Sequence, residues 1–320
     1  EQATENTFFN NMMDLIDSLP DYAGNDITAA SWGVGINNNV IHIFNALIGN
    51  ENGTSIDQIG MYGLLQQYQR WTAGEENKWL ANTDMLSLFE KAFEPIIGKT
   101  VLNEPVTSID YTGSGVTILT SNGAEYAAEK VIVTIPLNML KLPSITFNPP
   151  LSNERITALN KIGMDRGMKI ILKFDERVWP ENTGSLFGDG LVPEFWATGV
   201  GRGTDNIITA FVTGPNVATL QALGENLIPT VLAELDTLIG DASLHYVDHH
   251  VQNWSAQPYV RGAYSFGLPG MGNAREVIAQ PINNKVFFAG EATHNGGHHA
   301  TVHGAMETGL RAVNEILENA

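Results

Sequence analysis

The tail of the chain brings together residue types that could hold an electron-rich group. Residues 285–289 are a short apolar run, typical of a buried strand, and the run stops at Gly290, which is followed by Glu291. After a loop, Thr301 stands where a helix N-cap belongs. The free N–H groups of such a helix would point back at the strand end and would stabilise negative charge there.

The helix itself is predicted from its period. Apolar and small residues recur after Thr301 at the 3.6-residue spacing of one helix face: Val302, Ala305, Met306, Gly309, Val313, Ile316 and Leu317.

A lysine inside an apolar strand is the second candidate group. Lys169 lies in the run 167–174, and its amino group is costly to bury unless it is paired or hydrated. This favours a functional role for Lys169. In the alternative, the side chain simply extends to the surface.

An aromatic block lies closer to the tail. Residues 254–265 have the pattern Trp-x-x-x-Pro-Tyr-x-Arg-Gly-x-Tyr-Ser, with aromatic rings at Trp254, Tyr259 and Tyr264. Aromatic faces could orient an apolar or amine ligand while excluding water from it.

The tail and the aromatic block together resemble the flavin-dependent amine oxidases, which include polyamine and spermine oxidases, monoamine oxidases and lysine-specific histone demethylases. The run 300–305 is most similar to the demethylase and spermine oxidase branch. The resemblance implies that Glu291 meets the ribityl and phosphate region of FAD. It also implies that the first N–H groups of the helix, at Thr301 and Val302, face the flavin pyrimidine oxygen, where reduced flavin is negatively charged.

The resemblance also assigns roles in the aromatic block. Trp254 and Tyr259 would lie beside the isoalloxazine, and Tyr264 would form one wall of a cage for the amine. Thr301 stands where many relatives have the second cage aromatic, which leaves the cage open for a longer or bulkier substrate. Ala263 stands where monoamine oxidases have the flavin-linking cysteine, so FAD would be noncovalent.

Two further segments are similar to the family. The string LNEPVTSI at 102–109 resembles the opening of its β-meander, where Val106 would meet the adenine through its backbone. In 145–174 the chain resembles the family's strand, Pro-Pro-Leu turn, helix and lysine-bearing strand. Lys169 would then hold a water at flavin N5, the atom that accepts hydride.

We therefore expect an α/β fold: the remainder of a Rossmann-like FAD-binding domain plus a mixed sheet-and-helix substrate domain. The expected divisions are a helical part of the substrate domain at 1–80, the meander of the FAD-binding domain at 81–140, the substrate domain at 141–280 and a C-terminal FAD-binding segment at 281–320. Local patterns predict strands at 116–120, 131–135 and 207–212, a hairpin turn at Asn122-Gly123 and a helix at 227–239.

The family's dinucleotide-binding turn, G-x-G-x-x-G after a strand, is absent from the sequence. Residues 33–38 lack its third glycine and follow no predicted strand. Three explanations stay open: the N-terminal half of the site comes from a partner chain, the sequence is a truncated product that folds without cofactor, or it is a descendant that kept the cavity for binding only.

Four histidines, His294, His298, His299 and His303, offer a competing metal site. The spacing of His299 and His303 would put two ligands on one helix face, but the glutamate of H-E-x-x-H is missing. The flavin motif explains the same segment with fewer assumptions, so we predict no metal. Serine hydrolase chemistry has no support, because no G-x-S-x-G is present.

The amino-acid composition limits the classes of ligand and partner that the protein could bind. The 320 residues carry a net charge of −18, which argues against nucleic acid and is compatible with a cationic amine, although solubility alone explains it. The absence of cysteine excludes disulfides and thiolate ligands. No apolar run approaches the roughly 18 residues of a membrane span, so we expect a soluble protein whose compartment is undetermined.

The function predicted is FAD-dependent oxidation of an amine C–N bond, with a small amine and oxygen as reactants and hydrogen peroxide as product. The first alternative is a non-catalytic binding module or inactive fragment. The second is an L-amino-acid oxidase, which needs an arginine for the substrate carboxylate; Arg70, Arg166 and Arg202 cannot be ranked from sequence.

Overall fold

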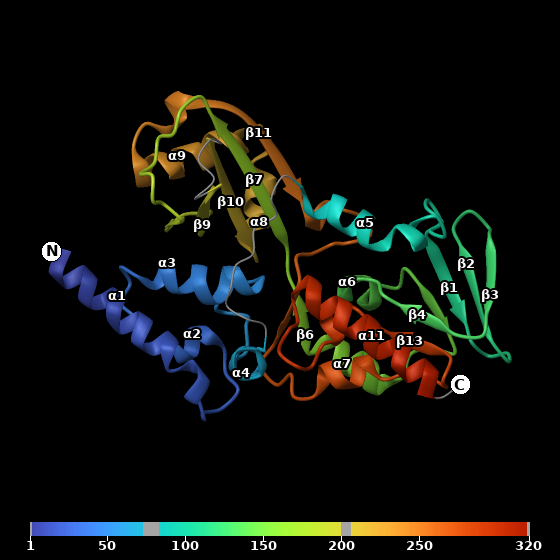
Figure 1. Ribbon diagram of the computed structural model, residues 1–320. Coiled ribbons are helices and arrows are strands. Elements are labelled where there is room, and N and C mark those ends of the chain that lie inside the picture. The colour runs from blue at the N-terminus through green and yellow to red at the C-terminus, as the bar shows by residue number, and fades with distance from the viewer. Residues whose placement is uncertain (1, 73–82, 200–205, 319–320) are drawn as a thin grey trace.

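The computed structural model describes residues 2–72, 83–199 and 206–318, with side chains from residue 6 onward. Figure 1 shows two lobes, with the N-terminal helices lying beneath the upper lobe and the two chain ends at opposite sides of the molecule. The architecture is a mixed α/β fold, as the sequence predicts. No helix in the described ranges is long and apolar enough to cross a membrane.

Helices dominate the first quarter of the chain, as expected. They share one core, in which Met12, Leu19 and Phe44 are buried together with Phe266 from far along the sequence. Arg202, one of the arginines considered for a substrate carboxylate, lies outside the described residues. The elements of this part are α1 (Gln2–Asp17), η1 (Leu19–Asp21), α2 (Ala29–Trp32), α3 (Ile41–Phe44), η2 (Asn45–Gly49), η3 (Asn50–Asn52) and α4 (Met61–Arg70).

The upper lobe is built on an antiparallel sheet with the order β11-β7-β10-β9-β8. Its strands pack their apolar sides against α8 and α9, around fully buried residues such as Ile170, Phe195 and Val231. The predicted strand at 207–212 and the predicted helix at 227–239 are confirmed. The elements are β7 (Gly167–Phe174), β8 (Ser185–Phe187), β9 (Glu194–Thr198), β10 (Ile207–Thr213), α8 (Asn216–Ala222), η4 (Gly224–Asn226), α9 (Leu227–Ile239), η5 (Ala242–His245) and β11 (Tyr246–Asn253).

The lower lobe carries the meander and the tail. Its larger sheet has the order β3-β2-β1-β5, and the predicted hairpin turn at Asn122-Gly123 joins two of these strands. A two-stranded parallel sheet pairs β13 with β4, and β12 pairs with β6. The elements are β1 (Val106–Asp110), β2 (Val116–Thr120), β3 (Glu125–Ala128), β4 (Val131–Val133), α6 (Leu137–Lys141), β5 (Thr146–Asn148), α7 (Asn153–Asn160), β6 (Ile162–Met164), η6 (Trp254–Ala256), β12 (Ser265–Gly267), α10 (Ala274–Ala279), β13 (Val286–Phe288), η7 (Glu291–Thr293) and α11 (Val302–Glu318).

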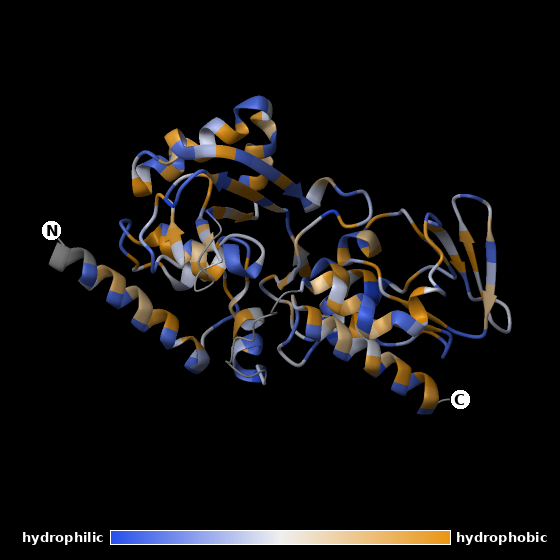
Figure 2. Cartoon of the chain, turned by 45° about the horizontal axis from the view of Figure 1, so that its top comes forward, coloured by the Kyte–Doolittle hydropathy of each residue, from blue (hydrophilic) through white to orange (hydrophobic). Residues whose placement is uncertain are grey.

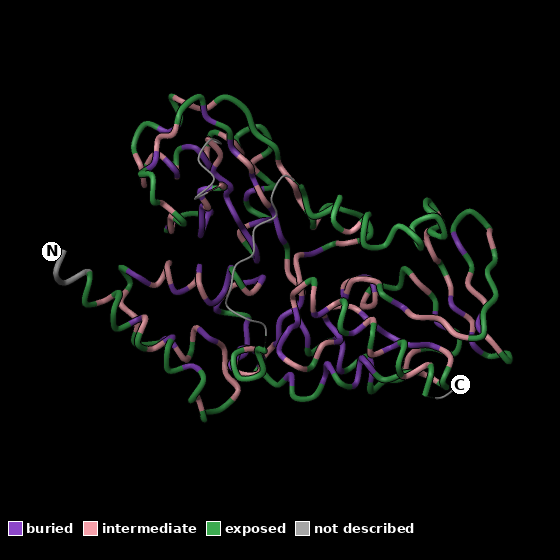
Figure 3. The backbone as a smooth tube through the Cα atoms, in the orientation of Figure 1, coloured by how far each residue is buried: buried purple, intermediate pink, exposed green. Residues whose placement is uncertain are grey.

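Helix α5 (Met85–Ile97) is unusual because it is apolar yet unpacked. Phe89 is half-buried and stacks on Phe93, but every other described side chain of this helix is exposed. Figure 3 shows the exposure along its length.

Helix α11 corrects one detail of the sequence prediction. The apolar residues at 3.6-residue spacing do share a face, and Figure 2 shows apolar and polar residues alternating along the helix. Most of the large ones are exposed, however. The buried residues are the small ones Gly304, Thr308 and Ala312. They let the helix lie close to the sheet, where a larger side chain would not fit.

Asn50 joins the N-terminal helices to the upper sheet. It is fully buried, its Nδ2 donates to Phe211 O at 3.1 Å, and its Oδ1 accepts from Thr213 N at 2.7 Å. These bonds take up backbone groups at the end of β10, and they fix the position of η3 against β10.

We expect Asn50→Ala to destabilise the fold by about 2–4 kcal/mol, because it leaves a buried N–H and a buried carbonyl without partners. Urea unfolding would measure the change. Asn52→Ala is the control: Asn52 is half-buried and bonds only to Ile48 O, so its loss should cost about 1 kcal/mol or less. Equal losses for the two variants would contradict the role given to Asn50.

Candidate functional site

A cavity of about 480 Å³ lies where the upper sheet, the aromatic block and the start of α11 meet. Four of the eight residues predicted to be catalytic or cofactor-binding line it: Lys169, Trp254, Tyr264 and Thr301. The structure thus brings together side chains from β7, from η6, from the residue that precedes β12 and from the C-terminal segment. Four others lie elsewhere or only beside it: Val106, Tyr259, Glu291 and Val302.

Lys169 enters the cavity from the middle of β7. Its Nζ lies 4.9 Å from the centre of the Trp196 ring and 5.4 Å from that of Phe211, and these two rings stack 4.4 Å apart. Burial lowers the pKa of Lys169, and the aromatic faces partly offset the lost hydration of its charge. Among the described residues no carboxylate or hydrogen-bond acceptor binds this Nζ, so its donors are available to a ligand or water.

Tyr264 forms a fixed wall of the cavity. Its hydroxyl donates to Glu51 O at 2.6 Å, and Gly53 lies against its ring, so that a Cβ at Gly53 would come within 2.8 Å of Cε2. Burial and the nearby carboxylates of Glu51, Glu194 and Glu291 raise the pKa of Tyr264. The phenol therefore stays protonated and acts as a donor.

Sequence reasoning missed two carboxyl groups, one of which lines the cavity and one of which lies near it. Glu51 lines the cavity with a side chain that is exposed overall, and lost hydration on the cavity side together with the charge of Glu194 raises the pKa of Glu51 to about 7. Glu194 is 2% exposed, one of its oxygens has no partner among the described residues, and burial raises its pKa too. Neither could be found locally, because Glu194 opens β9 and reaches this region only through the pairing of β9 with β10.

The start of α11 has the geometry predicted for it. Thr301 Oγ1 accepts from Gly304 N at 3.0 Å and donates to His298 O at 2.7 Å, which is a side-chain N-cap. The cap leaves the N–H groups of Val302 and His303 without a partner in the described part of the chain. These donors and the positive end of the helix dipole lie at the cavity end that holds Thr301.

Glu291 follows Gly290, whose φ of 124° is accessible essentially only to glycine. Its Oε1 accepts from Ser265 N at 3.2 Å, and its Oε2 accepts from Ser265 Oγ and from Ala300 N, both at 2.7 Å. Buried Arg275 donates to Ser265 Oγ at 2.7 Å, which directs the serine proton to Glu291. Glu291 thus ties β12 to the loop before α11, and its contact with a cofactor stays a prediction.

The remaining predicted residues are spread out. Tyr259 is 59% exposed and does not line the cavity, whereas Trp254, 44% exposed, does. Val106 lies on β1 in the meander sheet. The roles that the resemblance gives to these residues stay predictions.

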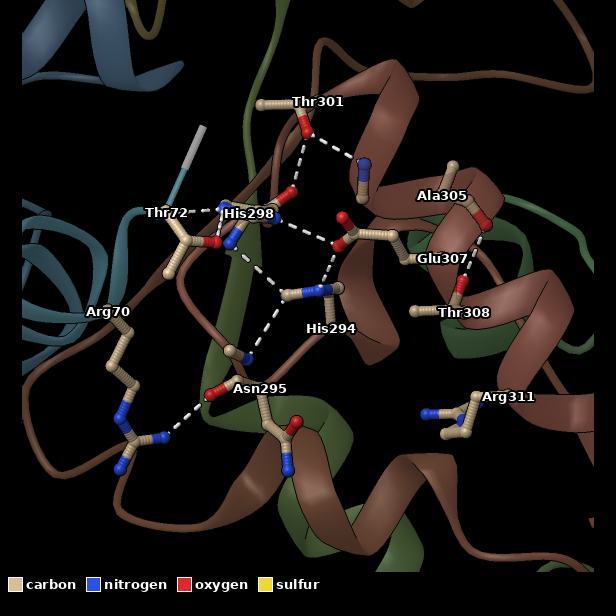
Figure 4. A network of polar contacts seen from close by, with 12 residues as sticks. Arg70, Thr72, His294, Asn295, His298, Thr301, Ala305, Glu307, Thr308 and Arg311 are labelled. Carbon is tan, nitrogen blue, oxygen red and sulfur yellow. Dashed lines mark hydrogen bonds and ion pairs between the residues drawn. The ribbon is translucent and has the colours of Figure 1, made fainter. Parts of the chain in front are cut away.

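The histidine cluster differs from the one expected from sequence spacing, which paired His299 with His303. The three groups that converge are His294, His298 and Glu307, while His299 precedes the helix (Figure 4). His294 Nδ1 accepts N–H bonds from Gly296 and His298, so its proton is on Nε2, which lies 2.7 Å from Glu307 Oε2.

His298 is fixed in the same way. Its Nε2 accepts from Thr72 N at 3.1 Å, so its Nδ1 donates to Glu307 Oε2 at 2.9 Å. A metal bound at His294 Nε2 would need the proton on Nδ1, facing two N–H donors. The pattern is therefore that of two neutral histidines donating to one carboxylate. It anchors Thr72, next to the end of α4, to the loop that leads to Thr301 (Figure 4).

Comparisons with known proteins agree with this architecture. The profile of the family described as flavin containing amine oxidoreductase matches residues 89–317. Lysine-specific histone demethylase 1B of Mus musculus is 34% identical over 225 residues, which are 67% of this chain and 27% of that protein. The peroxisomal N(1)-acetyl-spermine/spermidine oxidase of Bos taurus is 27% identical over 264 residues, 68% of this chain and 50% of that protein.

Solved structures share the fold. A triple mutant of putrescine oxidase matches with a TM-score of 0.82 at 19% identity, covering 98% of this chain and 76% of that one. Cyclohexylamine oxidase from Brevibacterium oxydans IH-35A gives 0.77 at 19% identity, with 98% and 75% covered. The chain thus spans half or less of the two curated relatives named above and about three quarters of these structures.

We expect Glu291→Gln to destabilise the protein by about 2–4 kcal/mol, because the amide cannot accept three hydrogen bonds and leaves Arg275 without a nearby negative charge. Urea unfolding would measure it, and the amide of Ala300 should exchange with solvent faster. Glu276→Gln, an exposed position on α10, is the control and should change stability by less than about 0.5 kcal/mol. An unchanged exchange rate at Ala300 would show that Glu291 does not hold the loop.

Proposed function

This chain belongs to the family of flavin-containing amine oxidoreductases, and from that membership we propose that its cavity is the amine-oxidising site of an FAD-dependent oxidase. One observation carries the proposal: one cavity is lined by a lysine amino group beside a stacked pair of rings, by a half-buried tyrosine and by a capped helix start whose first N–H groups have no partner among the described residues. A helix start suits the anionic side of a flavin, and aromatic walls suit an amine.

The residues present fit the ring end of the cofactor. Val302 and His303 offer N–H groups that have no partner in the described part of the chain, and Trp254 offers a partly exposed ring beside the cavity. The sequence contributes no G-x-G-x-x-G turn for the pyrophosphate. The chemistry that bound FAD would supply is oxidation of an amine C–N bond by hydride uptake, with reoxidation by oxygen to give hydrogen peroxide.

The positive charge of Lys169 favours an amine substrate whose reacting nitrogen is neutral. The ammonium of Lys169 disfavours a second positive charge near it and so lowers the pKa of an amine bound beside it. Its free donors would orient a water there. Tyr264 and the stacked pair of Trp196 and Phe211 would restrict the amine between ring faces and exclude bulk water.

Glu51 and Glu194 favour a positively charged group on the side of the cavity away from Lys169. Amines with a second, charged nitrogen are therefore the substrate class we propose, consistent with relatives named as spermine/spermidine and putrescine oxidases. An amino acid is less favoured, because no arginine is among the described residues that line the cavity.

We expect the purified chain to retain FAD through gel filtration and to form peroxide with spermidine but not with amino acids. Lys169→Met should lower the oxidation rate by about 10²-fold without displacing the flavin absorbance, because the ordered donor is lost. Lys173→Met is the matched control, since Lys173 lies on the same strand but is exposed. A colourless protein that ignores FAD would instead support a binding module, and peroxide formation from amino acids would support an amino-acid oxidase.

The pH dependence of amine binding should follow Glu51. Its pKa in the folded protein is raised from 4.5 to about 7, so the carboxyl is mostly neutral at pH 6 and ionised at pH 8. A dication such as putrescine should therefore bind more tightly as pH rises through 7, while a monoamine changes less. Because the folded state favours the protonated form, Glu51 also lowers folding stability as pH rises from about 4.5 to 7.

Calorimetric titration at pH 6, 7 and 8 would measure this, with Glu51→Gln expected to abolish the rise. Asp57→Asn, exposed on the same segment, is the control. A rise that persists in Glu51→Gln would assign the pH dependence to another group.

A further inference from the structure

The four histidines of the C-terminal segment differ in their surroundings. His294, His298 and His303 form a cluster of ring contacts, in which the ring centre of His298 lies 5.2 Å from that of His294 and 4.8 Å from that of His303. His299 makes no ring contact with any described residue, and it lines the cavity instead. Neither the hydrogen-bond network at Glu307 nor the proposed chemistry uses this residue.

His299 is a buried polar side chain without a partner in the described part of the chain. The residue is 5% exposed, and no described residue makes a hydrogen bond to either of its ring nitrogens. Buried polar groups in folded proteins nearly always have a hydrogen-bond partner, because an unmet donor or acceptor is destabilising. Since His299 lines the cavity, a molecule bound there can supply the missing partner.

The backbone on both sides of His299 is held in place. The peptide N–H that follows it belongs to Ala300, which donates to Glu291 Oε2 at 2.7 Å. The peptide carbonyl that precedes it belongs to His298, which accepts from Thr301 Oγ1 at 2.7 Å. Ala300 also has a φ of 62°, a left-handed conformation that is uncommon for a residue with a Cβ. His299 is therefore positioned before a ligand binds, which reduces the entropy lost on binding.

The ring of His299 is neutral at physiological pH. Burial, and then the positive charge of Arg275 and the neighbouring ring of His294, lower the pKa of His299 well below its usual range. A neutral imidazole has one N–H donor and one unprotonated nitrogen that accepts a hydrogen bond. The same surroundings disfavour a cationic nitrogen beside the ring. His299 therefore suits a ligand nitrogen that is uncharged and still carries a hydrogen.

We propose that the unprotonated ring nitrogen of His299 accepts a hydrogen bond from the N–H of the reacting amine nitrogen, which makes His299 a substrate-binding residue. This inference rests on the proposed function, in which the nitrogen that is oxidised is neutral. The bond fixes the direction of the nitrogen lone pair. His299 holds the hydrogen and does not remove it, because a ring whose pKa is lowered is a weak base.

The contact narrows the class of substrate. Primary and secondary amines carry an N–H when they are neutral, whereas neutral tertiary amines do not. Only the first two can donate to the ring of His299. The chain should therefore prefer putrescine to its tertiary analogue N,N,N′,N′-tetramethylputrescine, and His299 should contribute to the binding of the first compound alone.

Calorimetric titration at pH 8 tests this contact. His299→Leu keeps an apolar side chain but has no acceptor, so it should weaken putrescine binding by about tenfold and change the binding of tetramethylputrescine by less than about twofold. His299→Asn and His299→Gln place an amide oxygen near one ring nitrogen or the other, so one of them should bind putrescine within about threefold of the unsubstituted chain. His42→Leu is the control, because His42 is half-buried on α3 and does not line the cavity.

A measurement on the unsubstituted chain removes any dependence on how the variants fold. With ¹⁵N-labelled histidine, saturating putrescine should shift the ring nitrogen signals of His299 and leave those of exposed His250 in place. The inference is wrong if the His299 signals do not move, if His299→Leu retains full affinity, if it weakens both diamines equally, or if neither amide variant restores binding.

The two proposals can fail separately. A flavin-loaded chain that oxidises spermidine with the same KM after His299→Leu would support the proposed function and overturn this inference alone. Putrescine binding that depends on His299, in a chain that retains no FAD, would support the contact and contradict the proposed oxidation.

Discussion

The arrangement of the site depends on one buried charge. Arg275 is 2% exposed, and burial lowers its pKa to about 10, so it still carries its charge at neutral pH. That charge must be compensated locally. Glu291 compensates it through Ser265, and the same carboxylate holds the N–H of Ala300. Because Ala300 precedes the cap residue Thr301, the direction of α11, and with it the helix end at the cavity, is set by the neutralisation of a buried arginine.

Around the cavity, the ammonium of Lys169 lies on one side and the carboxyl groups of Glu51 and Glu194 lie on the other. Lys169 keeps its positive end beside the stacked rings of Trp196 and Phe211, where no carboxylate of the described residues binds it and its donors face the cavity. On the other side, lost hydration together with the charge of Glu194 raises the pKa of Glu51, and burial raises that of Glu194. A bound cation would oppose both shifts, so ligand binding and carboxylate ionisation should be coupled. The separation depends on the register of β9 and β10, which puts Glu194 opposite Phe211 and Trp196 opposite Thr209.

Local patterns were enough for much of the fold. The strand at 207–212 and the helix at 227–239 have strong periods, and their bounds were predicted almost to the residue. Lys169, Trp254, Tyr264 and Thr301 could be singled out because their motifs are short and continuous, and all four line the cavity. Glu51 and Glu194 were missed because long-range pairing, which no local pattern records, places them near the site. The packed side of α11 was missed because hydropathy weighs large residues, whereas close packing on the sheet selects small ones.

The exposed apolar face of α11, formed by Val302, Met306, Leu310, Val313 and Leu317, also affects how the molecule behaves in crowded solution. An exposed apolar surface promotes association between protein molecules. A net charge of −18 on each molecule opposes this by electrostatic repulsion over roughly a Debye length. Dispersion of this protein is then a balance between short-range adhesion and long-range repulsion. Salt shortens the repulsion, and acid near the isoelectric point of about 4.7 removes it. The strong acidity of the chain can thus be understood as colloidal protection for a surface that packing leaves uncovered.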